Sequence, residues 1–447
     1  MSALNQYLDL YRQNAAAIDG ASADVINALR PAALDILKAS RLPDRSVEGY
    51  EKTSIDEMFA PDYGVNVTGV NIPVDVAASF RCDVPAMSTL MGFVLNDSFM
   101  PVKSLQAKLP EGVIFTSLRE AAIKYPDLVG RYYGRLAPMD NPAVALNSLL
   151  LRDGVFIYVP RGVKMDKPLQ LVNIFSAPTP MMGIRRIVVA LEEDASASLL
   201  VCDHTQDPTT GYLASQVMEV DMARGASLRI CHIEESSAET SRHALNFFHQ
   251  EEGSHLAVTS ATLTCGSTRN EYNVLLDGEH AETLLAGMAI GTDKMHIDND
   301  SEVIHRACRC RSNQLFKYVL DDESDGAFEG SILVSPGARF TEAYQSDRNL
   351  LASTSAKMHC KPQLEIYNDD VKCSHGAATG QLDNEALFYM RTRGIPEAEA
   401  RTMLMQAFLL DVVETVEIPG VADRLRHLVE HRFAACDQSA CETCRKS

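Results

Sequence analysis

The segment RIVVALEEDASASLLVC, residues 186–202, shows the pattern that decides the fold, because two short apolar runs are joined by a tight polar turn. Arg186–Leu191 and Ser198–Cys202 are rich in Val, Ile and Leu, a composition typical of strands. The residues EDAS at 193–196 combine acidic and small side chains, which favour a turn. The segment therefore predicts a strand, a turn and a second strand.

The same unit recurs from about Leu150 to Cys373, with no strong helical pattern between the repeats. Further apolar runs lie at Phe156–Val159, Leu169–Phe175, Ser227–His232, Leu256–Leu263 and Glu302–Leu315. Further turn-like clusters lie at residues 224–227, 252–254, 277–279, 325–327 and 336–338. A strand-and-turn unit repeated every few tens of residues indicates a parallel β-helix, in which each coil covers the apolar face of the last. A β-sandwich has similar local signals and stays open as the alternative.

Helical patterns flank this mainly β region. Apolar residues recur at helical spacing up to Gly20, and Asp383 is well placed to begin the first of three C-terminal helices. The predicted domains are an N-terminal helical and irregular α/β domain at 1–145, a β-helix core at 146–380, a C-terminal helical domain at 381–435 and a Cys-rich tail at 436–447.

A Cys-x-His pair stands where the β region ends. Residues i and i+2 of a strand point to the same side, so Cys373 and His375 can present a thiol and an imidazole together. These groups are common ligands of iron, zinc and copper. The pair is only half of a typical site, so the other ligands would have to come from elsewhere. The alternative is that both residues are ordinary members of a turn or core.

One C-terminal helix is apolar on nearly all of its faces. Its candidate partner-docking residues are Met403, Leu404, Phe408, Leu409 and Val412. An all-apolar helix must be covered all round, and Met-rich surfaces are suited to docking. A protein partner is therefore expected, with burial inside the chain as the alternative.

Composition excludes several classes of protein. The 447 residues are 46% hydrophobic and carry a formal charge of −19, from 60 acidic and 41 basic residues. Such an acidic chain opposes nucleic acid and anionic membranes. The N-terminus carries no signal-peptide pattern, and no window approaches a transmembrane helix, so we expect a cytoplasmic protein. Its 11 cysteines then indicate reduced thiols.

Other cysteines form weaker candidate sites. Cys308 and Cys310 are predicted to share one side of a strand and to face the core. Cys436, Cys441 and Cys444 form a thiol-rich tail that could hold a metal if His431 or a partner completed the ligand set. The chain has no phosphate-binding loop, no dinucleotide fingerprint and no nucleophile elbow, so we do not expect it to hydrolyse ATP.

Three segments resemble a known family. PQLEIYNDDVKCSHGAATGQLDNEALFYMRTRGIPEAEARTML, from Pro362, is similar to the C-terminal signature of the SufD branch of the SufB/SufD family of iron-sulfur cluster assembly proteins. ALNSLLLRDGVFIYVPRGVKMDKPLQL, from Ala145, is similar to the start of the core shared by both branches. RLPDRSVEGYEKTSIDEMF, from Arg41, resembles the segment that precedes the core, although Tyr50 replaces an expected Trp.

This resemblance implies a right-handed parallel β-helix between helical domains, in a non-catalytic scaffold subunit. It also implies a ternary complex in which the chain pairs with SufB and binds the ATPase SufC, which hydrolyses ATP, through its C-terminal helices. His375 matches the family histidine that faces SufB, and Cys373 lies beside it. The implied cofactor is iron or a nascent iron-sulfur cluster, held transiently and shared with SufB.

Some alternatives stay open at this point. Reduced flavin has been associated with the complex, but the chain has no flavin motif. A homodimer of the isolated chain is another open question. The nearest alternative is the SufB branch, although the turn around YNDDVKCSHGAATGQLD favours SufD. A β-helix polysaccharide lyase or hydrolase is the alternative from another class.

Overall fold

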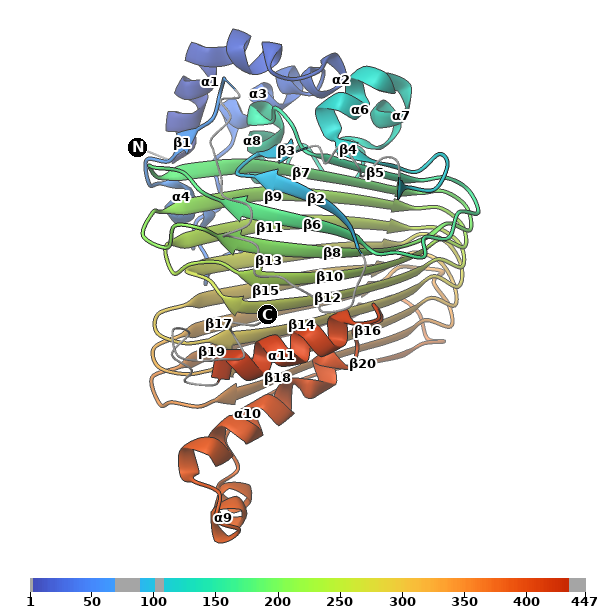
Figure 1. Cartoon of the computed structure of the whole chain (residues 1–447). Coiled ribbons are helices and arrows are strands. Elements are labelled where there is room, and N and C mark those ends of the chain that lie inside the picture. The colour runs from blue at the N-terminus through green and yellow to red at the C-terminus, as the bar shows by residue number, and fades with distance from the viewer. Residues whose placement is uncertain (1–2, 69–88, 101–107, 434–447) are drawn as a thin grey trace.

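A computed structural model describes residues 3–68, 89–100 and 108–433 of the chain. Its centre is a parallel β-solenoid, in which the chain alternates between two ten-stranded sheets (Figure 1). From Val155 onward, strands that follow one another in sequence lie in different sheets, and each pairs in parallel with the strand one coil later, up to the last coil. The predicted parallel β-helix is confirmed, and the β-sandwich alternative is wrong.

The first sheet holds most odd-numbered strands: β1 Gly64–Val65, β4 Ile114–Ser117, β5 Val155–Val159, β7 Met181–Leu191, β9 Tyr212–Met222, β11 Thr240–Gln250, β13 Ser267–Leu276, β15 His296–His305, β17 Asp325–Val334 and β19 Lys357–Ile366. The second sheet holds β2 Leu90–Leu95, β3 Ser98–Met100, β6 Leu169–Phe175, β8 Ser196–Thr205, β10 Ser227–Glu235, β12 His255–Thr264, β14 Glu282–Gly291, β16 Arg311–Leu320, β18 Glu342–Leu351 and β20 Lys372–Gln381. We call them the odd sheet and the even sheet.

The turns along one edge of the solenoid are built alike. Asp194 has a φ of 57° and donates its backbone N–H to the carbonyl of Arg224 on the next coil, at 2.9 Å. Gly225, with a φ of 68°, does the same to Glu252 at 2.8 Å. Equivalent bonds leave Gly253, His280, Arg309 and Phe340. This ladder explains why a short turn motif recurs in the sequence.

Two predicted boundaries are wrong for the same reason. The run Glu302–Leu315 was expected to be one strand, but β15 ends at His305 and β16 begins at Arg311. The turn between them lies in the ladder, so Cys308 and Cys310 do not share one side of a strand. Residues 325–327, expected to be a turn, begin β17. Stacking on the previous coil, and not the local apolar pattern, determines where these strands begin and end.

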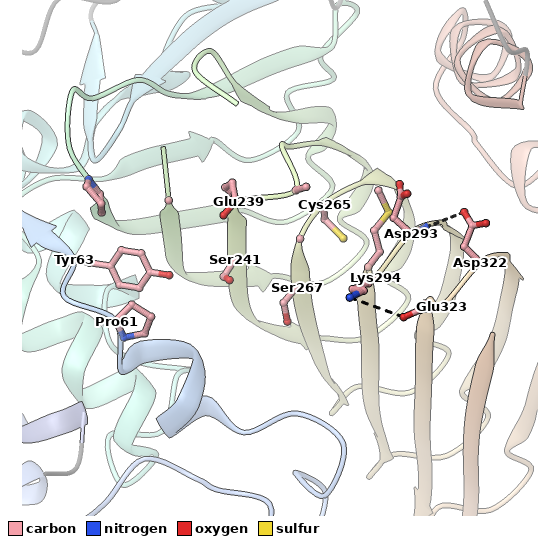
Figure 2. Close-up of a pocket in the computed structure, with 15 residues that line it drawn as sticks. Pro61, Tyr63, Glu239, Ser241, Cys265, Ser267, Asp293, Lys294, Asp322 and Glu323 are labelled. Carbon is pink, nitrogen blue, oxygen red and sulfur yellow. Dashed lines mark hydrogen bonds and ion pairs between the residues drawn. The ribbon is translucent and has the colours of Figure 1, made fainter. Parts of the chain in front are cut away.

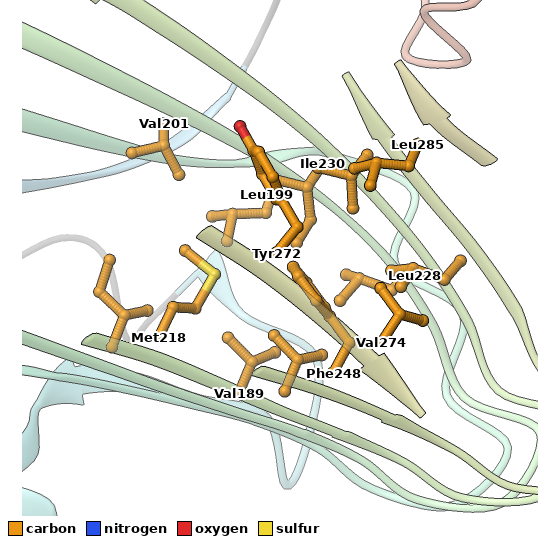
Figure 3. Close-up of a cluster of buried hydrophobic side chains, with 14 of the residues drawn as sticks. Val189, Leu199, Val201, Met218, Leu228, Ile230, Phe248, Tyr272, Val274 and Leu285 are labelled. Atoms are coloured by element: carbon orange, nitrogen blue, oxygen red, sulfur yellow. The ribbon is translucent and has the colours of Figure 1, made fainter. Parts of the chain in front are cut away.

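Apolar side chains fill the space between the two sheets. Val189 and Met218 of the odd sheet face Leu199 and Ile230 of the even sheet, and all four are at most 4% exposed (Figure 3). Such a core is stabilised by removal of apolar surface from water. The coils therefore hold one another in place.

Polar side chains also point into this space, where they are paired between neighbouring coils. Arg185 donates to Asp203 at 2.7 Å, and Thr268 donates to Glu234 at 2.8 Å. Both acids are buried. Burial raises the pKa of Glu234 to about 7. The pKa of Asp203 is lowered, because Arg242 and other cationic neighbours outweigh the opposing effect of burial.

The N-terminal helices cover the first coils and the outer face of the odd sheet (Figure 1). They are α1 Ala3–Gly20, α2 Asp24–Asn27, α3 Arg30–Ala39, α4 Ile55–Phe59, α6 Leu118–Lys124, α7 Pro126–Tyr132 and α8 Pro142–Leu150. Tyr50, where Trp was expected, lies on this outer face with its ring centroid 4.4 Å from the Arg269 guanidinium. One end of the solenoid is thus closed by the chain itself.

Three C-terminal helices follow β20: α9 Asn384–Thr392, α10 Glu397–Val413 and α11 Val421–Phe433. Helices α10 and α11 pack on the outer face of the even sheet, and α9 projects away from the solenoid (Figure 1). Buried contacts join Leu409 and Val412 of α10 to sheet residues such as Met288 and Leu350. Among the described residues, no helix is long and apolar enough to cross a membrane.

Candidate functional site at the open end of the solenoid

The last coil differs from the first because no described element covers it. Strand β19 pairs only with β17, and β20 pairs only with β18, so each has one free edge within the described residues. Side chains of β19 are half-buried or exposed along the whole strand, and nearly all of those of β20 are exposed. Strands deeper in the solenoid are mostly buried. The solenoid therefore ends in an open coil formed by β19 and β20.

An exposed sheet edge is a template for pairing with another chain, and soluble proteins usually block it with charges or with Pro. Pro362 lies within β19 and removes one backbone donor there. Between Cys373 and Gln381, however, β20 carries no Lys, Arg, Asp, Glu or Pro. Three large apolar side chains, Ile366, Tyr367 and Tyr344, are at least 40% exposed nearby. This end has the properties of a surface that another chain covers.

The Cys-x-His pair lies on β20, as predicted. Cys373 is paired in register with Ala343 and His375 with Gln345 on β18. Ala343 and Gln345 are buried inward-facing residues, and side chains at paired positions lie on the same side of a sheet. Cys373 and His375 therefore both face the interior side of the open coil.

The thiol and the imidazole have different surroundings. Cys373 is half-buried against the apolar cluster that contains Ile332 and Val334, and burial raises the pKa of its thiol. His375 is exposed. No hydrogen bond or ion pair to the described part of the chain holds its imidazole. His375 is thus the more accessible ligand of the two.

The chain does not complete a metal site around this pair. Within residues 3–68, 89–100 and 108–433, no three His, Cys, Asp or Glu side chains are grouped closely enough to hold a metal ion. Further ligands for a metal at His375 would have to come from a partner or from a small molecule. The open coil is therefore suited to a shared site.

The five predicted docking residues have different environments. Leu409 and Val412 are fully buried against the even sheet, while Leu404 and Phe408 are half-buried in the same cluster. Met403 is 43% exposed. Burial inside the chain, the alternative weighed above, thus accounts for much of the apolar character of α10.

Sequence reasoning missed the most exposed apolar residues of this region. Phe388 and Tyr389 on α9 are 67% and 58% exposed, and they lie on the helix that projects furthest from the solenoid. Their sequence signal was the adjacent Phe and Tyr in the first of the three predicted C-terminal helices. With Met403 they form what we call the α9 patch.

The other thiol candidates are not brought to the open coil. The sulfur atoms of Cys308 and Cys310 each donate to a backbone carbonyl of a neighbouring turn, at 3.2 Å. Cys436, Cys441 and Cys444 lie outside the described residues. No position can be assigned to those tail thiols relative to His375.

A surface pocket of about 930 Å³ lies elsewhere, beside Tyr63 and the turns of the middle coils (Figure 2). Cys265 lies at its wall but is fully buried, and burial raises the pKa of that thiol. Lys294 and Glu323 form an ion pair at its rim, at 4.0 Å. None of the predicted site residues lines this pocket.

Comparison with known proteins agrees with this architecture. Residues 174–408 match the SufBD core domain of SUF system iron-sulfur cluster assembly, and residues 1–171 match the SufBD protein N-terminal region. The chain belongs to the SufBD family of iron-sulfur cluster assembly proteins. The resemblance seen in the sequence is confirmed.

Several curated relatives carry family names. An iron-sulfur cluster assembly SufBD family protein of Synechocystis sp. is 25% identical over 425 residues, which cover 93% of each chain. The cluster assembly protein SufD of Bacillus subtilis is 27% identical over 348 residues, covering 76% of this chain and 78% of the relative. SufD of Escherichia coli is 33% identical over 165 residues, covering 37% of this chain and 39% of the relative.

Proposed function

We propose that this chain is a SufD-like scaffold subunit that pairs with a SufB protein through the open coil. The open coil itself carries the proposal, because a solenoid closed by helices at one end is left uncovered at the other. Its free strand edges suit the addition of strands from a second solenoid, with backbone hydrogen bonds supplying affinity. The SufD names of two relatives support this branch over SufB.

In the proposed complex, the Cys373–His375 pair is one half of a site for iron or a nascent iron-sulfur cluster. A neutral imidazole is a suitable iron ligand, and the exposed His375 points to the side that the partner would cover. The partner would supply the remaining ligands. The metal is thus handled as cargo of the assembly reaction. Family membership favours this function over the polysaccharide lyase or hydrolase.

The α9 patch is the proposed docking surface for a SufC ATPase. Phe388, Tyr389 and Met403 are exposed apolar residues on the side of the molecule away from the helical N-terminus. Aromatic and Met side chains are enriched at protein interfaces. ATP hydrolysis then belongs to the docked subunit, and this chain acts as a non-catalytic scaffold.

Co-expression with SufB and SufC from the same source, followed by affinity purification through this chain, tests the proposal. We expect all three chains to co-elute in size-exclusion chromatography as one stable complex. A chain that elutes alone, in the presence of folded SufB and SufC, would reject the proposed function.

A further inference from the structure

A second cluster of polar side chains lies in the open coil, away from the Cys373–His375 pair. The amide nitrogen of Asn349 on β18 lies 2.8 Å from a carboxylate oxygen of Asp347 and 3.2 Å from the sulfur of Cys360 on β19. It also lies 3.4 Å from the hydroxyl oxygen of Thr379 on β20, and the Cys360 sulfur is 3.8 Å from that oxygen. Three strands thus bring four polar side chains to one point.

The position of this cluster is unusual for the core of a solenoid. Deeper coils place many apolar side chains at the centre, whereas β18 presents Gln345, Asp347 and Asn349 in succession on its inward face. Each of the three is at most 3% exposed. Buried polar atoms without partners are costly, so a row of three calls for an explanation.

Hydrogen bonds within the described chain do not satisfy this row. One carboxylate oxygen of Asp347, the amide oxygen of Asn349 and both polar atoms of the Gln345 amide have no partner there. The unpartnered oxygens of Asp347 and Asn349 belong to the cluster around the Cys360 thiol. They are the kind of donor set that a bound cation would complete.

The Asn349 amide could turn its oxygen towards a cation. Its NH₂ group now faces the Asp347, Cys360 and Thr379 acceptors, while its oxygen is unpaired. Rotating the amide by half a turn exchanges its nitrogen and oxygen with little change of shape. The oxygen would then face three other acceptors, an arrangement that is favourable only around a positive ion.

We propose that Cys360, Asp347, Asn349 and Thr379 form a binding site for a thiophilic divalent metal ion, of the class of Fe²⁺ or Zn²⁺. A thiolate and a carboxylate are the strong ligands, and the amide and hydroxyl oxygens are weaker ones. The cluster contains two residues of the His, Cys, Asp and Glu types, and no group of three such residues occurs within the described part of the chain. The remaining coordination positions of the metal ion are open to water or to a partner chain that covers the open coil.

This site is distinct from the Cys373–His375 pair. Thr379 lies four residues beyond His375 on β20, a separation of roughly 13 Å along a strand. Among the described residues, His375 is also not grouped with Cys360 and Asp347 closely enough to hold the same ion. The site therefore goes beyond the proposed function, because it does not depend on SufB or on cluster assembly.

Cobalt(II) titration of the isolated full-length chain tests this site, because Co²⁺ bound to a thiolate gives a charge-transfer absorption band. The tail thiols must not compete, so the parent protein carries Cys436→Ser, Cys441→Ser and Cys444→Ser. We expect the parent to bind one ion and to show the band. Cys360→Ser should abolish the band, and Asp347→Asn should weaken binding by about tenfold or more. Competition with Zn²⁺ should remove the band from the parent.

Cys308→Ser is the matched control, because its thiol is also half-buried but lies in the turn between β15 and β16, and it should keep the band and the affinity of the parent. The proposal is wrong if the parent shows no band, if the band survives Cys360→Ser, or if Asp347→Asn binds as tightly as the parent. Loss of the band in Cys373→Ser would instead show that the metal ion binds at the Cys373–His375 pair. Since neither complex formation nor cluster yield is measured, failure here is distinguishable from failure of the proposed function.

Discussion

At the scale of single residues, Glu234 shows how a buried acid in the solenoid couples stability to pH. Its pKa is raised to about 7 from an ordinary value of 4.5, mainly by burial. The folded protein therefore holds a proton between pH 4.5 and 7 that the unfolded chain releases. The stability that this group contributes is complete below pH 4.5 and is lost as the pH rises to 7.

Glu234→Gln imitates the protonated acid and removes this dependence. Relative to the native chain, the free energy of unfolding of the variant should rise by about 3 kcal/mol between pH 4.5 and pH 7. Chemical denaturation of both proteins across this range measures the difference. If the free energies of unfolding of the two proteins change with pH in parallel, Glu234 is already ionised in the folded protein at low pH.

His375 is the residue on which the proposed cluster site depends. His375→Ala should lower the iron or cluster content of the ternary complex severalfold, because the exposed imidazole is removed while the strand remains. Cys373→Ala should have a smaller effect, since that thiol is half-buried. Iron and sulfide analysis of the purified complex measures the yield.

Ser374→Ala is the control for both variants, because alternate residues on β20 point to opposite faces. It should leave the yield unchanged, and all three variants should still form the complex. If the complex containing His375→Ala has normal iron and sulfide content, His375 is not a ligand of the proposed site.

At the scale of elements, the turn ladder explains why the repeat was visible in the sequence. Gly225 and Gly253 both have positive φ, a conformation that costs a residue with a Cβ about 1–2 kcal/mol. A Cβ at Gly253 would meet open space, whereas one at Gly225 would lie 2.3 Å from a carboxylate oxygen of Asp194. The two positions therefore separate backbone strain from crowding.

Gly253→Ala should lower the free energy of unfolding by about 1 kcal/mol, and Gly225→Ala should lower it by more. Urea denaturation of the two variants checks the order. Equal losses would mean that Asp194 moves aside without cost. No loss in either variant would contradict the role of the ladder.

The C-terminal helices separate residues that stabilise the chain from residues that are free to bind. Leu409 is fully buried on the even sheet, whereas Phe388 is 67% exposed on α9. Phe388→Asp should therefore release the ATPase while leaving the folded chain intact, because it places a charge in the proposed apolar interface. Pull-down of SufC measures this loss.

Ile123→Asp is the matched control, since Ile123 is 63% exposed but lies on α6 at the other end of the molecule. It should bind SufC like the native chain. If Phe388→Asp also retains SufC, the docking surface lies elsewhere.

The strands also show what local pattern can and cannot predict. Runs such as Leu169–Phe175 were found because most of their residues are Leu, Val, Ile or Phe, which favour strands. Strand β11 was missed, because Arg242 and Asn246 stand at inward positions that usually hold apolar residues. Those polar groups are tolerated only because neighbouring coils pair them, as when Arg242 donates to Asn270.

The same limit applies to the candidate site. Cys373 and His375 are two residues apart, so strand geometry alone places them together. Asp347 and Cys360 are brought together by the passage of the chain from β18 in one sheet to β19 in the other, which no local spacing predicts. The alternating polar residues of β18 were the available signal, since they interrupt an inward face that is otherwise expected to be apolar.

At the scale of the whole molecule, the two ends of the solenoid support its proposed role as a subunit. The N-terminal helices close one end and share a large apolar cluster with the odd sheet. Within the described residues, the other end has two free strand edges and exposed aromatic side chains. It also carries the Cys373–His375 pair, which is half of a typical metal site. A molecule built in this way is expected to function in a complex.

Hydrogen-deuterium exchange of this chain, alone and with SufB, tests most directly whether the open coil is the interface. Pairing with a partner strand should protect backbone amides of β19 and β20, whose edges are free in the isolated chain. We predict that protection on adding SufB is largest in residues 357–381 and is absent from α1 and α6. Unchanged exchange in residues 357–381, with protection elsewhere in a complex that has formed, would contradict the account.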